Sequence, residues 1–175
     1  VAAAPAVAGG RVYIGSLDST FYALDAETGT VEWRFEESNN WFWGQAIVNE
    51  GTVLAPSLDG NLYALDAGTG DLQWFLETEG AIVGSPAVVF DMIAIPSNDG
   101  RVRVARLRDG AQLDACNLGE SVRTPLVEKD GHIYFSAQDH SIWSLRIKSN
   151  GNPDEIWVHL TNKDDPLPRG RALAC

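Results

Sequence analysis

The sequence predicts an all-β fold in which one four-stranded unit occurs four times. Four aspartates recur 41, 40 and 40 residues apart, each in a similar junction: Asp18, Asp59, Asp99 and Asp139. Short runs such as AVVF and MIAI are apolar on nearly every residue, and no helical periodicity is present. Continuous apolar runs indicate strands that are covered on both faces. Repeats of about 40 residues built from short strands are typical of the blades of a β-propeller.

Each unit divides into four short strands in chain order. The first strands begin near a proline or its replacement Ala46, and are predicted at 4–8, 45–49, 85–89 and 124–128. The second strands are predicted at 11–16, 52–56, 92–96 and 132–136. The third strands are predicted at 20–25, 61–66, 101–106 and 141–146. The fourth strands are predicted to end at Trp33, Trp74, about Cys116 and Trp157.

The turns between the second and third strands carry the recurring aspartates. The Asp-Gly pairs at 59–60 and 99–100 predict two-residue type I′ hairpins, which need positive φ at both central positions. Ser19 and His140 replace the glycine in the other two units. Because these residues tolerate positive φ less well, their turns are expected to be strained or differently shaped.

A twelve-residue phrase links the third strand to the fourth in the first two units. Residues 22–33 read YALDAETGTVEW, and residues 63–74 read YALDAGTGDLQW. The glycine supplies a left-handed residue to the turn, and the aspartate accepts hydrogen bonds from turn amides. The tryptophan offers an apolar plate to the neighbouring blade, and burying one such ring contributes about 2–3 kcal/mol. The residues expected to dock the blades are Asp25, Gly29, Trp33, Asp66, Gly70, Trp74 and Trp157.

The phrase resembles the tryptophan-docking motif of the PQQ-type (quinoprotein-like) β-propeller repeat. Residues 23–33 and 64–74 match it well, and the surrounding blade pattern covers residues 1–159. The later copies depart from it, since Arg106 and Arg146 replace the aspartate and Asp114 replaces the tryptophan.

This repeat usually forms seven or eight blades, so the resemblance implies that the chain supplies part of a larger ring. The four blades are expected at about 1–40, 41–80, 81–119 and 120–159, and residues 160–175 are expected to be a linker or the start of a further blade. The ring would be completed by further blades or by a second copy, unless four blades close alone.

Charge and composition exclude several classes of partner. The net charge of −11 disfavours binding to nucleic acid and to anionic lipid, which both require a basic face. No apolar run is long enough to span a bilayer. Cys116 and Cys175 lack the spacing of a zinc site, and whether they pair stays open.

The resemblance implies a non-catalytic, extracytoplasmic scaffold that binds protein partners, similar to outer-membrane assembly lipoproteins of the BamB type. On this reading the protein lies in the periplasm or at the cell surface, and its signal or anchor is outside this sequence. No catalytic, metal or cofactor site is expected. One alternative is a section of a PQQ-dependent dehydrogenase, whose family binds the quinone on the ring axis with calcium, a catalytic aspartate and often adjacent cysteines. The second alternative is a cell-surface propeller that binds peptide or carbohydrate.

The most unusual local stretch is NNWFWGQ at residues 39–45, which joins the first blade to the second. Trp41 and Trp43 are candidates for an aromatic contact with a protein partner. The alternative is that the rings pack between blades. For Trp43, which aligns with Val83 and Val122, packing is favoured; for Trp41 the two readings are balanced.

Four arginines alternate along the third blade: Arg101, Arg103, Arg106 and Arg108. They are interpreted as a solvated edge that pairs with nearby acids rather than as a basic recognition stripe.

Overall fold

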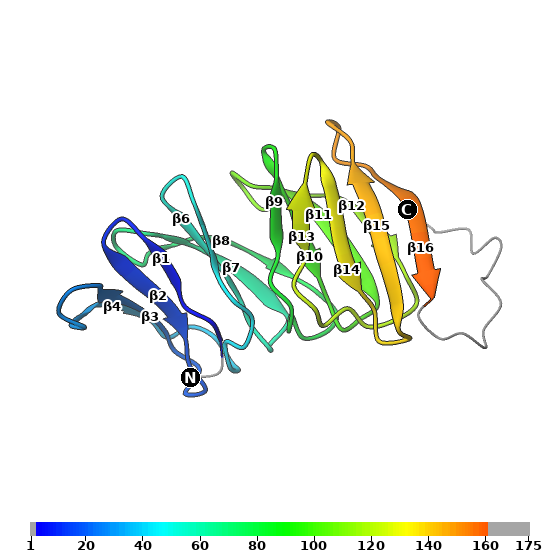
Figure 1. Ribbon diagram of the computed structural model, residues 1–175. Coiled ribbons are helices and arrows are strands. Elements are labelled where there is room, and N and C mark those ends of the chain that lie inside the picture. The colour runs from blue at the N-terminus through cyan, green and yellow to red at the C-terminus, as the bar shows by residue number, and fades with distance from the viewer. Residues whose placement is uncertain (1–2, 161–175) are drawn as a thin grey trace.

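The computed structural model, which describes residues 3–160 and the side chains of residues 3–152, confirms the predicted all-β propeller fold. Four antiparallel sheets of four strands stand side by side in an arc, and each sheet is one blade (Figure 1). Within the described residues there is no helix that could cross a membrane.

The strands follow the predicted periodicity, but the first strand of each blade begins two or three residues later than predicted and the fourth ends one to three residues later. The first two blades contain β1 (Ala6–Ala8), β2 (Arg11–Gly15), β3 (Phe21–Asp25), β4 (Val31–Phe35), β5 (Ile47–Asn49), β6 (Thr52–Pro56), β7 (Asn61–Asp66) and β8 (Leu72–Glu77). The last two contain β9 (Ala87–Val89), β10 (Met92–Pro96), β11 (Arg101–Arg106), β12 (Gln112–Asn117), β13 (Val127–Lys129), β14 (His132–Ser136), β15 (Ser141–Ile147) and β16 (Pro153–Leu160).

Within each blade, spatial order equals chain order, so every connection inside a blade is a hairpin. The short first strands of neighbouring blades contact each other, β1 with β5 and β9 with β13. The first strands therefore form the inner side of the arc, and the first and fourth blades lie at its two ends (Figure 1).

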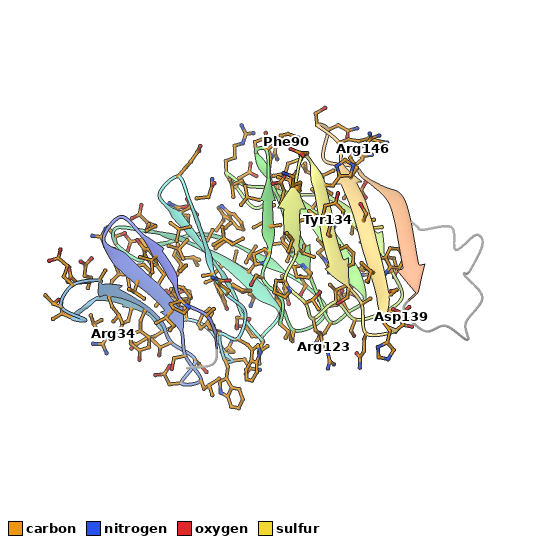
Figure 2. All side chains as sticks on the ribbon, viewed as in Figure 1. Arg34, Phe90, Arg123, Tyr134, Asp139 and Arg146 are labelled. Carbon is orange, nitrogen blue, oxygen red and sulfur yellow. The ribbon has the colours of Figure 1, made fainter. Side chains whose placement is uncertain are left out.

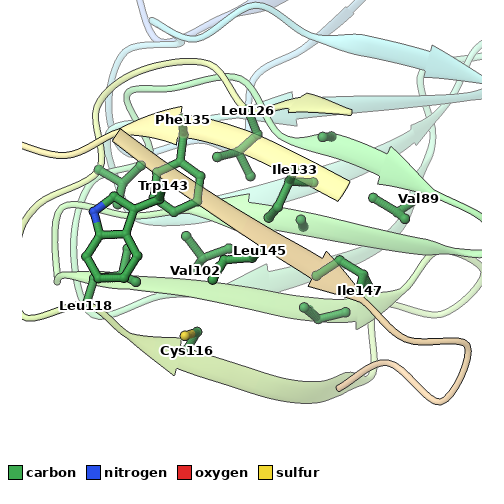
Figure 3. Packing of buried hydrophobic residues seen from close by; sticks show 14 of the residues in the cluster. Val89, Val102, Cys116, Leu118, Leu126, Ile133, Phe135, Trp143, Leu145 and Ile147 are labelled. Carbon is green, nitrogen blue, oxygen red and sulfur yellow. The ribbon is translucent and has the colours of Figure 1, made fainter. Parts of the chain in front are cut away.

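The core consists of three apolar layers, one between each pair of neighbouring blades. Between the first and second blades the layer is aromatic, with Tyr13, Phe21 and Tyr63 almost fully buried. Between the third and fourth blades, Val102 and Leu118 of the third blade share one apolar cluster with Ile133, Phe135 and Leu145 of the fourth (Figure 3). Because successive sheets cover each other's faces, the inner strands need no polar side, which explains the continuous apolar runs.

The tryptophans of the repeated phrase lie over glycines of the next blade. Trp33 is 8% exposed, and its indole N–H donates to the carbonyl of Ala67 at 3.1 Å. A Cβ added to Gly70 would lie 2.6 Å from the Trp33 ring, and one added to Gly110 would lie 2.4 Å from the Trp74 ring. Both glycines also have positive φ, +79° and +69°. The turn therefore requires glycine for its backbone and for the ring that covers it.

The aspartates of the phrase hold the same turns. Asp25 accepts hydrogen bonds from the amides of Glu27 and Thr28 at 3.1 and 2.7 Å. Hydrogen bonds from the Thr28 side chain and amide keep the pKa of Asp25 below its ordinary value. Asp66 accepts the equivalent amides at 2.8 and 2.9 Å.

The predicted type I′ turns are wrong. Gly60 and Gly100 have φ of +92° and +84°, but the aspartates before them do not have positive φ. The Gly60 amide donates to the carbonyl of Ser57, three residues back, at 3.3 Å. This is the three-residue hairpin in which one left-handed residue follows a type I turn. Ser19 and His140 occupy that position at +66°, so their turns keep the shape and carry the strain.

Cys116 in β12 is fully buried in the layer between the third and fourth blades (Figure 3) and is disulfide-bonded. The other cysteine of the sequence, Cys175, lies outside the described residues.

Candidate partner-binding surface

One edge of the arc carries the connections between blades and is here called the connection face. It consists of connections 36–46, 78–86 and 118–126 together with the β2–β3, β6–β7, β10–β11 and β14–β15 turns. In Figure 2, Arg123 and Asp139 mark this edge, and Phe90 marks the opposite edge. The candidate residues Trp41 and Trp43 lie in the first of these connections.

Phe42 anchors the first connection. Its side chain is fully buried, and its ring centroid lies 5.3 Å from that of Phe21 and 5.9 Å from that of Tyr63. The Phe42 amide donates to the carbonyl of Ser16 at 3.3 Å. A Cβ on Gly15 would lie only 2.2 Å from the Phe42 Cβ, so the glycine provides the space that the ring needs. The buried phenylalanine fixes the two residues on either side of it.

Trp41 and Trp43 are both exposed, at 44% and 43%. The expectation that Trp43 packs between blades is therefore wrong. Along an extended segment, alternate side chains point to opposite sides, so burial of Phe42 places both indoles outside. Leu17 follows the hydrogen-bonded Ser16 in the β2–β3 turn of the connection face and is 38% exposed.

The first connection is also held by Asp59, which lies in the β6–β7 turn of the second blade. One carboxylate oxygen, Oδ2, accepts hydrogen bonds from the Ser38 hydroxyl at 2.9 Å, the Asn39 amide at 3.0 Å and the Tyr63 hydroxyl at 2.8 Å. Burial opposes the charge of Asp59, but the hydrogen bonds outweigh it and its pKa lies below the ordinary value. Burial, and then the bond to Asp59, raises the pKa of Tyr63 to about 12.

The contacts of Asp59 with the first connection and with Tyr63 are here called the clamp. The third blade repeats the clamp with an arginine in place of the tyrosine. Asp99 accepts the Glu79 amide at 3.1 Å, as Asp59 accepts the Asn39 amide. Arg103 stands four residues after Asp99, where Tyr63 stands after Asp59, and its Nη1 lies 2.6 Å from Asp99 Oδ2. The N–H direction is not aligned for a hydrogen bond, so this contact is an ion pair.

The interpretation of the four arginines as a solvated edge is wrong for one of them. Arg103 is 5% exposed and belongs to the blade interface. Arg101 pairs with Glu79 at 3.0 Å, and Arg106 and Arg108 both pair with the exposed Asp109. These three pairs are solvated, as expected.

Each of the three connections between blades has a buried residue equivalent to Phe42. The connections differ in the residues on either side of it. The amides of Ile82 and Val122 donate to carbonyls of the preceding turns as the Phe42 amide does, so these three residues are equivalent. Val122 is thus the counterpart of Phe42, and the sequence alignment of Val122 with Trp43 is wrong by one residue. The residues equivalent to the tryptophans are Ala81 and Val83 in the second connection, and Ser121 and Arg123 in the third. The aromatic pair occurs in the first connection alone among the described residues.

The sequence does not single out Leu17, because Leu58 occupies the same place in the second blade. The only early signal for the Tyr63 clamp is its spacing of four residues from Asp59, which Tyr22 and Asp18 share. Tyr22 indeed donates to Asp18 at 2.9 Å, in a more exposed setting.

The described residues do not fit a quinone and calcium site. Each recurring aspartate is occupied by amides or side chains of its own turn, as Asp18 is by the Thr20 amide at 3.0 Å. Cys116 lies near the end of β12, is fully buried and is already disulfide-bonded. Among the side chains that the structure describes, those of residues 3–152, no group of three histidine, cysteine, aspartate or glutamate residues could hold a metal ion.

One protein family and several solved structures resemble this chain. A family model described as outer membrane protein assembly factor BamB matches residues 1–168. Comparison of the sequence with curated proteins gives no match. Among solved structures, BamB from Moraxella catarrhalis is 17% identical with a TM-score of 0.75; the match covers 90% of this chain and 47% of that one.

Two further structures share the fold at low identity. Quinohemoprotein alcohol dehydrogenase from Comamonas testosteroni is 17% identical with a TM-score of 0.78, over 91% of this chain and 35% of that one. The computationally designed Ika4 protein is 22% identical with a TM-score of 0.75, over 83% of this chain and 90% of that one. The chain therefore spans about half the length of the matched BamB and about a third of the dehydrogenase.

Proposed function

The chain belongs to the family of the outer membrane protein assembly factor BamB, and from that premise we propose that it is a non-catalytic propeller scaffold that binds protein partners through its connection face. The observation that carries the proposal is the pair of exposed indoles, Trp41 and Trp43, on a connection whose backbone is held in place. Tryptophan, with tyrosine and arginine, is enriched among the residues that contribute most of the binding energy at protein interfaces.

Order in the connection matters for affinity. Binding by a flexible loop loses conformational entropy, about 0.5–1.5 kcal/mol for each immobilised side chain. The Asp59 hydrogen bonds and the buried Phe42 ring fix the backbone between and beside the indoles before any partner arrives. The two rings and Leu17 are exposed apolar side chains of the connection face, and the first connection also carries the exposed acidic residues Glu36 and Glu37. We expect a partner that presents both apolar and basic side chains.

An extracytoplasmic location is part of the proposal. Disulfides persist in the periplasm and outside the cell, whereas thiols are kept reduced in the cytosol. The disulfide of Cys116 supports the oxidising compartment that the family membership implies.

Site-specific crosslinking tests the proposal. A photoreactive phenylalanine analogue is placed at Trp41 or Trp43 in the native cell, and crosslinked proteins are identified by mass spectrometry. The matched control carries the analogue at Phe90, which is 67% exposed on the opposite edge (Figure 2). We expect one recurring protein partner at positions 41 and 43 and none at 90. Absence of that difference would refute the connection face as the binding surface.

The dehydrogenase alternative is tested separately, with purified protein. PQQ and calcium are added, and bound quinone is measured by absorbance after gel filtration, with dye-linked oxidation of alcohols as the second readout. We expect neither, because the described residues offer no site for the pair. Stoichiometric quinone binding with oxidation would overturn the scaffold assignment.

A further inference from the structure

A polar cleft of about 440 Å³ opens between the second and third blades, beside their outer strands β8 and β12. The second blade contributes Glu77 and Glu79 to its lining, and the third blade contributes Arg101, Arg103 and Gln112. Arg101 and Arg103 are two residues apart on β11, so their side chains point to the same side of the sheet. The volume lies in the range of small-molecule sites in proteins.

The cleft exists because the third blade lacks a ring that the second blade has. Arg103 is paired with Ala115 at the register position where Tyr63 is paired with Phe75. The ring centroids of Tyr63 and Phe75 are 6.4 Å apart, so two aromatic rings occupy this part of the second blade. The methyl group of Ala115 leaves the corresponding space of the third blade open, and Ala115 lines the cleft.

Arg103 brings unused hydrogen-bond donors to this cleft. A guanidinium group has five N–H donors. Arg103 is 5% exposed, and among the described residues its guanidinium group has one contact, the ion pair with Asp99. Its Nη1 atom is buried and makes no hydrogen bond. Because a buried donor without an acceptor costs free energy, the site favours a ligand that brings acceptor oxygens.

The charges around the cleft favour a neutral ligand. Arg103 is paired with Asp99, and Arg101 is paired with Glu79 at 3.0 Å. Glu77 is exposed and adds a carboxylate that makes no ion pair with a described residue. An anion would therefore meet no unpaired positive charge, and a cation would meet two guanidinium groups. A neutral ligand avoids both costs.

Hydroxyl groups match the remaining hydrogen-bonding capacity. The two arginines offer donors, the two glutamates offer acceptors, and the Gln112 amide offers both. A hydroxyl group donates one hydrogen bond and accepts two, so a ligand with several hydroxyl groups can pair with every one of these side chains.

We propose that this cleft binds a neutral polyhydroxylated ligand, which is the chemistry of a saccharide. Its hydroxyl oxygens accept hydrogen bonds from Arg103 and Arg101, and its hydroxyl hydrogens are donated to Glu77. The site is separate from Trp41 and Trp43, which lie in the first connection, and it does not depend on the scaffold function.

Isothermal titration calorimetry on the whole chain tests the proposal. The probes are the methyl glycosides of glucose, galactose, mannose and N-acetylglucosamine, and sodium acetate is the anionic probe. We expect at least one glycoside to bind with an affinity that is unchanged between about 0.05 and 0.5 M sodium chloride, because screening does not affect a neutral ligand. No binding by any of the four would overturn the proposal, and so would binding by acetate alone.

Ala115→Phe places in the cleft the ring that the second blade carries at Phe75. It leaves both arginines unchanged and is expected to weaken glycoside binding at least about tenfold. Arg34→Phe is the matched control, because Arg34 is exposed and stands opposite Tyr22 at the same register position of the first blade. We expect the control to bind as wild type does.

Gln112→Ala gives a second measurement at an exposed position, where the fold is not at risk. The lost hydrogen bonds are expected to weaken binding about threefold to tenfold. Circular dichroism shows that each variant is folded. Glycoside binding that both Ala115→Phe and Gln112→Ala leave intact would place the ligand elsewhere and overturn the proposal. Neither result bears on the crosslinking test at Trp41 and Trp43.

Discussion

Replacing Tyr63 with phenylalanine tests the clamp that orders the connection face. Tyr63→Phe removes one hydroxyl donor to Asp59 with little change in side-chain volume. Tyr63 is 4% exposed, donates to Asp59 at 2.8 Å and accepts from the Asn61 side chain at 3.1 Å. Tyr22→Phe is the matched control, because Tyr22 makes the same contact with Asp18 in an exposed setting.

The expected loss of stability in Tyr63→Phe depends on the hydrogen bonds that Asp59 keeps in the variant. A hydrogen bond to a charged group contributes about 1.5–3 kcal/mol to stability. Asp59 keeps the Ser38 and Asn39 donors in the variant, so its charge is not left unpaired. We therefore expect Tyr63→Phe to lower the free energy of unfolding by about 2 kcal/mol at neutral pH. In Tyr22→Phe water replaces the lost partner, and the loss is expected to stay below about 0.5 kcal/mol.

The pH dependence gives a second signature of the same clamp. Because the folded-state pKa of Tyr63 is raised from about 10 to about 12, its stabilising effect is complete below pH 10 and is lost as pH rises from 10 to 12. The pKa of Asp59 is lowered, so its effect is present above its ordinary pKa and is lost as pH falls through the lower folded-state value. The difference in the free energy of unfolding between wild type and Tyr63→Phe is therefore largest between about pH 4 and 10, and it decreases at lower and at higher pH.

Urea unfolding followed by tryptophan fluorescence measures these differences at pH 7 and at pH 11. Equal losses for the two phenylalanine variants at pH 7 would show that the Tyr63 hydroxyl exchanges its partner for water in solution. A difference that stays constant up to pH 11 would contradict the raised pKa. Either result would remove the physical basis for an ordered connection.

Three further predictions concern the same interfaces. Phe42→Ala is expected to lower the free energy of unfolding by about 3–5 kcal/mol, whereas Trp41→Ala changes it by less than about 0.5 kcal/mol; urea titration distinguishes a buried anchor from an exposed ring. Gly15→Ala is expected to cost at least about 2 kcal/mol and to lower Tm, because its Cβ would lie 2.2 Å from that of Phe42; an unchanged Tm would contradict the packing. Arg103→Met is expected to cost about 3 kcal/mol by leaving the buried Asp99 without its cation, and adding Asp99→Asn is expected to restore part of that loss; no recovery in the double variant would argue against the ion pair.

Strand positions can be predicted from the sequence because turn-forming residues recur at a regular spacing. An aspartate turn every 40 or 41 residues and a glycine turn between the third and fourth strands fix both ends of the long strands. The turn type does not follow, because Asp-Gly suits a two-residue hairpin as well as a type I turn followed by a left-handed glycine. Only the bonding of Ser57 to Gly60 and Asn61 decides between them.

The orientation of NNWFWGQ depends on tertiary packing. Alternation requires Phe42 to face away from Trp41 and Trp43, but it does not say which side is buried. The missing Cβ of Gly15 decides this, and Gly15 lies 27 positions earlier. The sequence does carry a signal for the contact between Arg103 and Asp99. Arg103 stands four residues after Asp99, as Tyr63 does after Asp59. Its burial depends on an ion pair that composition does not reveal.

Comparison between blades separates residues that build the ring from residues that are available for recognition. The anchors Phe42, Ile82 and Val122 are all fully buried, so their variation is confined to apolar types that fill the space between blades. The positions beside them change from aromatic to aliphatic to polar. Ala81, Val83 and Ser121 are partly buried, and the Ser121 hydroxyl donates to the carbonyl of Asn98 at 2.8 Å, whereas Trp41 and Trp43 are exposed. Trp41 and Trp43 place two large apolar rings in water where alanine and valine serve the fold equally well. Since exposed apolar surface favours association, these two rings support the proposal that the connection face binds a partner.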